Sequence, residues 1–309
     1  MQQTVFFRNV LLDPATPNMH PFPEGVAYFS AGKWWYSGVN YGGSARVVPI
    51  EKQDLAALKE WILNVFGDAS PEASDYRPGT AFKRISLPLA TSGNLQQAVD
   101  LEAMAQGFVA LRLLVSKMQD IFETVEPGLP NQHCYGHKIR ELLLLACMEV
   151  EASWVAVLKA NDYVRGRYTT RDYVKLLQPM LLDRWILELR SYPRFPRMIP
   201  FHGWDPQAPT QSLDWYDAYN KTKHDREGHL LVATLGRAVN AVAAAVIMHT
   251  AQFSGGSTNA TDGSGAALRS VFNYKINSAM YTRSCYIPNA EGGSKTPWEW
   301  DLIDYPFPP

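Results

Sequence analysis

The chain has 309 residues, of which 46% are hydrophobic, 12% aromatic and 19% charged, and its formal net charge at pH 7 is −1. This composition is typical of a soluble globular protein and excludes a disordered tail or a collagen-like chain. The balanced charge also excludes a protein that grips long duplex nucleic acid over its whole surface, so any polyanion site must be local. The length allows about two domains or one large one.

The N-terminal residues do not resemble a secretory signal, because their apolar stretch is interrupted by Arg8 and closed by Asp13 and Pro14. The longest apolar segment, residues 230–248, contains Arg237 and Asn240, and both side chains would be costly in lipid. We therefore interpret this segment as a buried helix. We expect a cytoplasmic protein without membrane association.

The sequence carries no metal or cofactor signature. Cys134, Cys147 and Cys285 are odd in number and lack the spacing of zinc ligands, so no disulfide or metal framework is predicted. There is no GxxxxGK(S/T) phosphate loop, no GxSxG nucleophile turn and no HExxH zinc motif. His133 and His137 are four residues apart, but their loop context favours a structural or surface role. We predict no bound metal and no cofactor.

Residues 1–93 predict a small lobe that contains β-structure and one helix. The segments GVAYF and WWYSGV flank a turn and predict two short strands. From Leu55 onward, Leu58, Ile62 and Val65 continue an apolar pattern at helical spacing, and Gly67 supplies a left-handed stop. The following stretch, residues 68–93, has no sustained period, so we predict a loop or short edge strand and a lobe boundary there.

Residues 94–253 predict a helical bundle, which makes the fold class mainly α. Asn94 stands at an N-cap position before a long helical pattern that runs from Leu95 to about Thr124 and ends by Pro127. A second long helix is predicted over residues 138–160, with Asn161 closing its end. Its apolar stripe consists of Ile139, Leu142, Leu143, Ala146, Val150 and Val157.

The remainder of this domain predicts a short helix at residues 171–178 and a proline-rich extended segment at residues 185–204. A third long helix is expected from Leu213 to Phe253, with a break allowed at Gly228. Residues 254–309 then predict a flexible loop followed by an irregular, aromatic C-terminal tail. The sequence shows no internal repeat.

The most informative segment is SLDWYDAYNKTKHDREGH, residues 212–229. In a helix, Asn220, Lys223 and His224 share one face with Tyr216, while Arg226 lies on the adjoining face. This spacing directs a polar cluster with an imidazole to one side. The alternative interpretation is structural: the aromatic side chains pack in the core and the charged residues form a solvated face.

This segment, together with the helix that contains IRELLLLACMEVEASW and the stretch PFHGWDP, resembles bacterial members of the HEPN superfamily of helical bundles. The resemblance covers roughly residues 95–253. HEPN ribonucleases carry an Arg, a polar residue, a few variable residues and a His near the start of a late helix. Asn220 and His224 match the polar residue and the His, and Tyr219 occupies the place of the Arg.

The resemblance implies a metal-independent endoribonuclease that acts on RNA in bacterial stress or phage defence, and it implies a homodimer. In this chemistry His224 is the acid/base, since histidine moves protons near neutral pH. Asn220 orients the phosphate or the imidazole, and Lys223 and Arg226 supply positive charge to the phosphoryl oxygens. We also count Tyr219 and Glu149 among the substrate-binding candidates.

Glu149 interrupts the apolar run of the second long helix. A carboxylate in this position either points to solvent or meets a cation such as Lys223, Arg226 or Arg140. A paired Glu149 would hold the cations of the site in place and would raise the pKa of a nearby histidine. The sequence leaves both interpretations open.

The stretch from Arg165 to Arg197 carries a net charge of +5, from eight basic and three acidic residues, with aromatic side chains between them. This composition suits the stacking and phosphate contacts of single-stranded RNA, with Arg190 and Arg194 as candidates. The alternative is that the arginine stems cover the bundle while their charged ends stay solvated.

Two other functions fit the sequence. The first is a catalytically inactive HEPN-like module that binds a nucleotide, RNA or a protein partner, with the motif residues serving packing and dimerisation. The second is a structural or assembly subunit that uses exposed aromatic side chains such as Trp34, Trp35 and Trp298. Tyr219 favours the inactive module, whereas His224 favours the enzyme.

Overall fold

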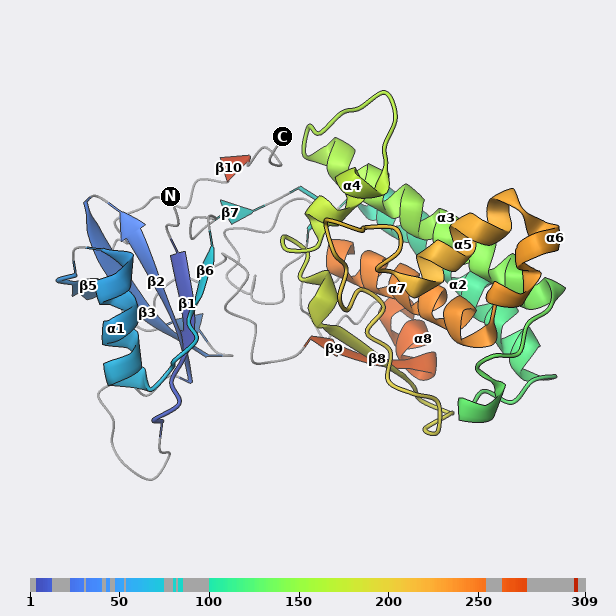
Figure 1. The fold of residues 1–309 in the computed structure, drawn as a ribbon, viewed down its shortest axis with the longest axis horizontal. Coiled ribbons are helices and arrows are strands. Elements are labelled where there is room, and N and C mark those ends of the chain that lie inside the picture. The colour runs from blue at the N-terminus through green and yellow to red at the C-terminus, as the bar shows by residue number, and fades with distance from the viewer. Residues whose placement is uncertain are drawn as a thin grey trace. The chain divides into compact units, whose positions relative to one another are not determined.

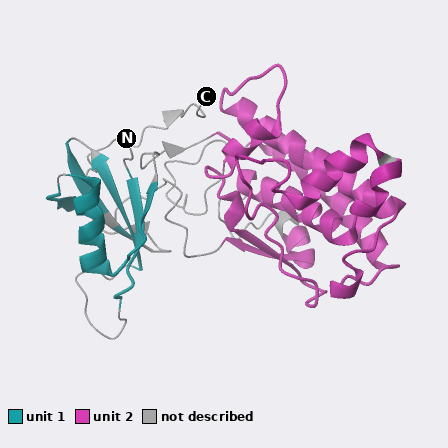
Figure 2. Cartoon of the chain, viewed as in Figure 1, with its two compact units in different colours: residues 1–82, 89–96, 278–305 teal, residues 83–88, 97–277, 306–309 magenta. Residues whose placement is uncertain are grey.

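The computed structural model describes residues 4–12, 23–30, 32–40, 43–44, 48–52, 54–74, 80–81, 83–85, 100–253, 263–276 and 303–304. These residues fall into two compact units (Figures 1 and 2). The first unit contains the described residues up to 81 together with 303–304, and the second contains 83–85, 100–253 and 263–276. Helices make up most of the regular structure, so the predicted mainly-α class is confirmed.

The first unit contains an antiparallel sheet. Its strands are β1 (Thr4–Arg8), β2 (Glu24–Ser30), β3 (Lys33–Asn40), β4 (Gly43–Ser44), β5 (Val48–Ile50) and β6 (Glu72–Ser74). The order is β4-β3-β2-β1-β6, and β5 also pairs with β3. β2 and β3 form the predicted hairpin, in which Phe29 pairs with Trp34. β6 is a short edge strand, as predicted. Two further strands, β7 (Thr80–Ala81) and β10 (Ile303–Asp304), pair in parallel.

Helix α1 (Leu55–Phe66) packs on this sheet, and its limits are set by local chemistry. The Asp54 carboxylate accepts a hydrogen bond from the Ala57 N–H at 2.8 Å, which caps the first turn. Gly67 ends the helix with a φ of 74° and donates its N–H to the Leu63 carbonyl. The predicted helix and its glycine stop are therefore confirmed. The shared core consists of Leu58, Ile62 and Phe66 with Val5, Phe7, Ala27, Trp34, Tyr36 and Ile50.

The second unit holds the other seven α-helices of the described chain. They are α2 (Leu101–Phe122), α3 (His137–Ala160), α4 (Thr170–Tyr173), α5 (Asp214–His224), α6 (Arg226–His229), α7 (Leu235–Phe253) and α8 (Gly263–Val271). Single 3-10 turns are η1 (Leu129–Asn131), η2 (Val174–Leu176), η3 (Leu182–Arg184) and η4 (Leu230–Val232). Strands β8 (Trp185–Leu189) and β9 (Phe272–Ile276) form an antiparallel pair.

Helix α7 is the centre of this unit. It packs against α2, α3 and α5, and α3 also packs against α2 and α5 (Figure 1). Nearly every side chain from Leu235 to Gln252 is buried or half-buried, so the apolar segment is the buried helix that the sequence predicts. None of the helices in the described ranges is long and apolar enough to span a membrane.

Three predicted limits differ from the structure. The N-cap of α2 is Asp100, whose carboxylate accepts a hydrogen bond from the Ala103 N–H at 2.9 Å, whereas Asn94 lies outside the described residues. The predicted third helix is broken before Gly228, because the backbone becomes extended at Asp225 (φ −138°, ψ 91°). That side chain caps α6 by accepting the Gly228 N–H. Residues 263–276, predicted as loop and irregular tail, form α8 and β9.

Trp154 of α3 is the centre of an aromatic cluster in the second unit. Its side chain is fully buried, and its ring centroid lies 4.8 Å from Tyr173, 5.1 Å from Trp204 and 5.3 Å from Tyr216. These rings come from α3, α4, α5 and the segment between β8 and α5. The cluster therefore fixes α5 and the connecting segments against α3.

We predict that Trp154→Ala lowers the free energy of unfolding by about 3–5 kcal/mol, because it leaves a large cavity among rings that cannot collapse together. Urea denaturation followed by circular dichroism measures this loss. Trp154→Phe is the matched control and is expected to cost less, since the buried indole N–H has no hydrogen-bond partner among the described residues. A loss below about 1 kcal/mol for the alanine variant would contradict a central role for this ring.

Candidate functional site

Glu151 of α3 connects α3 to α5 through two hydrogen bonds. The Tyr216 hydroxyl donates to Oε1 at 2.5 Å, and the Tyr219 hydroxyl donates to Oε2 at 3.1 Å. Both tyrosine side chains are buried, and Glu151 is half-buried. Each carboxylate oxygen therefore has its own phenol donor, which offsets the cost of taking the charge out of water.

The cluster continues to the surface through Lys223. Its ammonium donates a hydrogen bond to the Tyr219 hydroxyl at 2.9 Å and lies 4.9 Å from the centroid of the same ring. We name Glu151, Tyr216, Tyr219 and Lys223 the tyrosine–carboxylate cluster. It leads from the half-buried carboxylate to an exposed cation on the last turn of α5.

Burial, together with the Glu151 carboxylate, keeps the two phenols protonated. Burial, followed by the hydrogen bond and charge of Glu151, raises the pKa of Tyr216 well above its ordinary value. Burial and the charge of Glu151 raise the pKa of Tyr219 in the same direction. Burial also raises the pKa of the adjacent Cys147 thiol. These groups thus serve as neutral donors or packing groups, and Cys147 is not an activated nucleophile.

His224 is the last residue of α5, and its side chain is exposed. Lys223, beside it in the chain, is also exposed. Asn220 is half-buried, and its amide donates to the Tyr216 carbonyl at 3.0 Å within the same helix. The side chain of Arg226 lies outside the described part of the structure. The end of α5 therefore presents an imidazole and an ammonium to solvent.

Tyr219, the residue in the place of the motif arginine, points into the protein. Its side chain is 1% exposed, and its hydroxyl is shared between Glu151 and Lys223. It therefore acts as a link between α3 and α5 rather than as an open contact surface. Arg140 of α3 strengthens the same junction, because its guanidinium donates to the Thr222 carbonyl at 2.8 Å near the end of α5.

Glu149 is not paired with Arg140 or Lys223, two of the three cations named for it from the sequence; the side chain of the third, Arg226, is not described. Arg140 and Lys223 donate to Thr222 and Tyr219 instead. Glu149 is half-buried, and desolvation raises the pKa of its carboxyl above the ordinary value. The carboxylate that organises the site is thus Glu151, two residues further along the helix.

The predicted RNA-contact arginines lie apart from this cluster in the sequence. Arg190 follows β8, and its guanidinium donates two hydrogen bonds to Asn273 of β9, at 3.2 and 3.0 Å. Arg194 is exposed and makes no hydrogen bond or ion pair within the described ranges. Arg197 is occupied by an ion pair with Glu188 at 2.6 Å. Arg194 is therefore the most available of the three.

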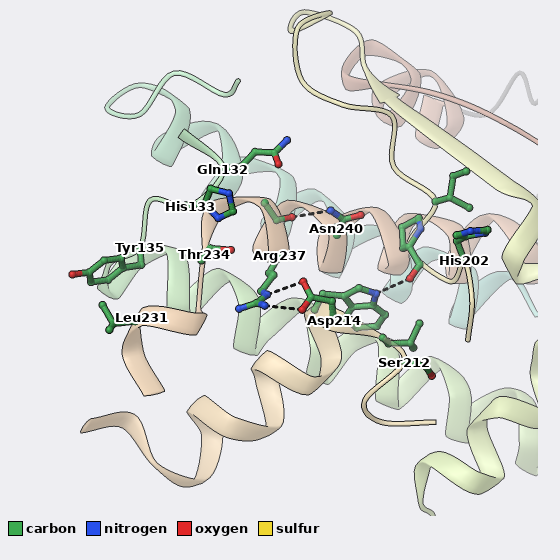
Figure 3. Close-up of a pocket in the computed structure, with 15 residues that line it drawn as sticks. Gln132, His133, Tyr135, His202, Ser212, Asp214, Leu231, Thr234, Arg237 and Asn240 are labelled. Carbon is green, nitrogen blue, oxygen red and sulfur yellow. Dashed lines mark hydrogen bonds and ion pairs between the residues drawn. The ribbon is translucent and has the colours of Figure 1, made fainter. Parts of the chain in front are cut away.

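A groove of about 630 Å³ lies beside the other end of α5 (Figure 3). It is formed by three segments that are distant in sequence: residues 132–135, residues 199–215 and residues 231–240. Asp214 and Arg237 form its central ion pair, with distances of 2.8 and 2.7 Å. The polar side chains on its walls are Gln132, His133, Tyr135, His202, Ser212, Thr234 and Asn240. We name this the α5–α7 groove.

No protein-family model, curated protein or solved structure matches the chain. The functional assignment therefore depends on the site itself. Sequence reasoning selected the end of α5, where an exposed histidine and lysine are found, but it missed Glu151 and the α5–α7 groove. The helical spacing of α3 indicates the position of Glu151, because this residue lies one turn from Cys147 and Trp154 on the face that meets α5.

We predict that Glu151→Gln lowers the free energy of unfolding by about 1–3 kcal/mol, because one tyrosine hydroxyl then faces an amide N–H₂ and loses its acceptor. Urea denaturation at neutral pH measures the change. Glu149→Gln is the matched control on the same helix, and its stability should equal or exceed that of the wild type. Equal losses in the two variants would show that the tyrosine hydrogen bonds are not what matters.

The difference in unfolding free energy between Glu149→Gln and the wild type should depend on pH. Because the pKa of Glu149 is raised in the folded state, the folded protein binds a proton more tightly than the unfolded chain, so ionisation of Glu149 lowers stability as pH rises through this window. Below the ordinary glutamate pKa of about 4.3 both states are protonated and the penalty is absent. Any gain from Glu149→Gln should therefore be seen at pH 7 and vanish at low pH. A gain that persists at low pH would contradict this cause.

Proposed function

We propose that this protein is an RNA-directed protein of the HEPN kind, in which the second unit is the helical bundle and the end of α5 is a metal-independent endoribonuclease site. The observation that supports this best is the exposed His224, which follows Lys223 in the chain; the Lys223 ammonium donates to the Tyr219 hydroxyl, which in turn donates to Glu151. An imidazole open to solvent next to a fixed cation has the chemistry that phosphodiester transfer needs. The proposed setting is the bacterial cytoplasm, in stress or phage defence.

The proposed reaction breaks one P–O bond and forms another. The ribose 2′-oxygen attacks the adjacent phosphorus, the bond to the 5′-oxygen breaks, and the products are a 2′,3′-cyclic phosphate and a 5′-hydroxyl end. A base takes the proton of the 2′-hydroxyl, and an acid gives a proton to the departing 5′-oxygen. His224 takes one of these roles. Lys223 stabilises negative charge on the phosphoryl oxygens.

A homodimer would supply both the base and the acid that this reaction needs. One imidazole cannot accept and donate a proton in the same step, whereas two copies of the α5 end would supply two His224 rings and two Lys223 ammonium groups. Asn220 is half-buried one turn before His224, and its carbonyl oxygen remains available to orient the imidazole or a ribose hydroxyl. Arg226 is the proposed second cation, because it follows α5 by two residues.

Flanking RNA contacts are proposed at the basic stretch that contains Arg190 and Arg194. Arg194 is exposed and has five donor groups for phosphate oxygens. Arg190 is held in place by Asn273 and keeps donors that those two bonds do not use. These side chains would add affinity that falls with salt and does not depend on base identity.

The second candidate function is a catalytically inactive module that binds RNA, a nucleotide or a protein partner. It is favoured by Tyr219, because a tyrosine committed to Glu151 replaces a guanidinium at the motif position. In this case Lys223 and His224 bind a ligand without cleaving it. The two functions predict the same residues at the surface and differ only in whether RNA is cut.

We predict that the purified protein cleaves single-stranded RNA in the presence of EDTA and that His224→Ala lowers the cleavage rate by about 10²- to 10⁴-fold, because the acid/base is removed. Gel analysis of a labelled RNA measures the rate and identifies the cyclic phosphate. His229→Ala is the matched control: this ring is one short helix away, lies 3.8 Å from Asp225, and should leave the rate unchanged.

Undiminished cleavage by His224→Ala would refute the acid/base role. RNA binding without cleavage by the wild type would support the inactive module instead. Binding measured against salt with Arg194→Ala then tests the basic stretch: the slope of log affinity against log salt should become shallower by about one.

A further inference from the structure

The α5–α7 groove has the size and the walls of a small-molecule site. Its volume of about 630 Å³ falls within the range of ligand pockets, about 300–1,000 Å³. Figure 3 shows Tyr135 and His202 at opposite ends of the groove, with His133, Asn240 and the Asp214–Arg237 pair between them; the Asn240 amide is directed along α7 to the Gly236 carbonyl. The groove lies at the start of α5, whereas His224 is at its end. It is thus separate from the proposed cleavage site.

The walls of the groove are already fixed by hydrogen bonds. The Leu235 N–H donates to the Cys134 carbonyl at 2.7 Å, and the Gly236 N–H donates to the Gln132 carbonyl at 2.9 Å. On the other wall the Trp215 indole donates to the Pro200 carbonyl at 2.8 Å. A ligand would therefore enter a preformed site and would not have to order these segments.

The positive charge of Arg237 and the negative charge of Asp214 neutralise each other in the groove. Among the described residues that line the groove, Arg237 and Asp214 alone are permanently charged at neutral pH, and they bind each other through two hydrogen bonds. The third hydrogen bond of Arg237, at 2.8 Å, goes to the Val232 carbonyl. Because the guanidinium is occupied in this way, the groove is poorly suited to a phosphate group, which prefers unpaired cations.

The uncharged polar groups of the groove are still available. Among the described residues, neither the His133 ring nor the His202 ring makes a hydrogen bond, and both side chains are exposed. Asn240 donates to the Gly236 carbonyl at 2.9 Å, which leaves its carbonyl oxygen and one N–H for a ligand. The groove thus offers both donors and acceptors.

Apolar and aromatic groups complete the lining. Leu231, which is 61% exposed, and the half-buried Ile199 contribute apolar surface, whereas Pro200, Leu213 and Trp215 are buried side chains of the walls; Tyr135 is 52% exposed at one end. An exposed tyrosine ring is a stacking surface for another flat ring. The combination of apolar surface, a stacking ring and mixed uncharged donors and acceptors selects a planar ligand with a polar edge.

We propose that the α5–α7 groove binds a planar, uncharged ring whose edge carries hydrogen-bond donors and acceptors, which is the chemistry of a nucleobase. In this site Tyr135 stacks on the ring, and His133 and Asn240 bond to its edge. If the proposed function is correct, the groove reads one unpaired base of the RNA. The binding itself does not depend on cleavage.

The experiment titrates adenosine, guanosine, cytidine and uridine separately into the full-length protein and follows binding by isothermal titration calorimetry. At least one nucleoside should bind with a Kd of about 1 mM or tighter, a modest affinity for a site of this size. Its 5′-monophosphate should bind within about threefold of the nucleoside, since the lining that the structure describes holds no unpaired permanent cation. Ribose and inorganic phosphate serve as probes of the other parts of a nucleotide.

His133→Ala should weaken binding of that nucleoside by about tenfold, as expected for one lost hydrogen bond of about 1.4 kcal/mol. Asn240→Ala is the second variant and should have a similar effect. His137→Ala is the matched control, because His137 is also exposed, lies four residues away and does not line the groove. It should bind the nucleoside like the wild type.

The proposal is overturned if no nucleoside binds, if inorganic phosphate binds as well as the nucleotide does, or if His137→Ala weakens binding as much as His133→Ala. The titration is repeated with His224→Ala. Nucleoside binding by this variant without any RNA cleavage by the wild type would contradict the nuclease and leave the groove intact. RNA cleavage by the wild type without nucleoside binding would support the nuclease and contradict the proposed ligand of the groove.

Discussion

The hydrogen bonds of Glu151 are the interaction on which the described site depends. A half-buried carboxylate is costly unless its oxygens are satisfied, and here each oxygen accepts one phenol, from Tyr216 and from Tyr219. Because both phenols belong to α5, the requirement fixes the rotation of this helix against α3. Any rotation that freed one hydroxyl would leave a buried donor and a charged acceptor unpaired.

This constraint determines what each end of α5 presents. At the C-terminal end, Lys223 is tied to Tyr219, and the next residue in the chain is the exposed His224. At the N-terminal end, Asp214 is brought to Arg237 of α7 and forms the centre of the groove. One rigid helix of eleven residues therefore positions an ion pair at one end and an imidazole at the other.

Local patterns made much of the fold predictable. The apolar spacing of α1 with Gly67 at its end, the stripe of α3 and the hairpin of β2 and β3 all depend on residues close together in the sequence. The break at Asp225 and the pairing of β8 with β9 depend on capping and on contacts between distant segments. The choice between Glu149 and Glu151 shows the same limit. Two residues on a helix are about 200° apart, so only one of the two carboxylates can face α5.

The groove could not be predicted from local sequence patterns, for a related reason. Its lining comes from the loop before α3, the segment before α5 and the start of α7, and no short motif connects them. The sequence around His133 shows only its loop context, which gives no information about the walls opposite. What brings these walls together is the packing of α5 on α3 and α7. The same carboxylate and the same aromatic cluster around Trp154 that fix the end of α5 therefore also hold the groove open on its other side.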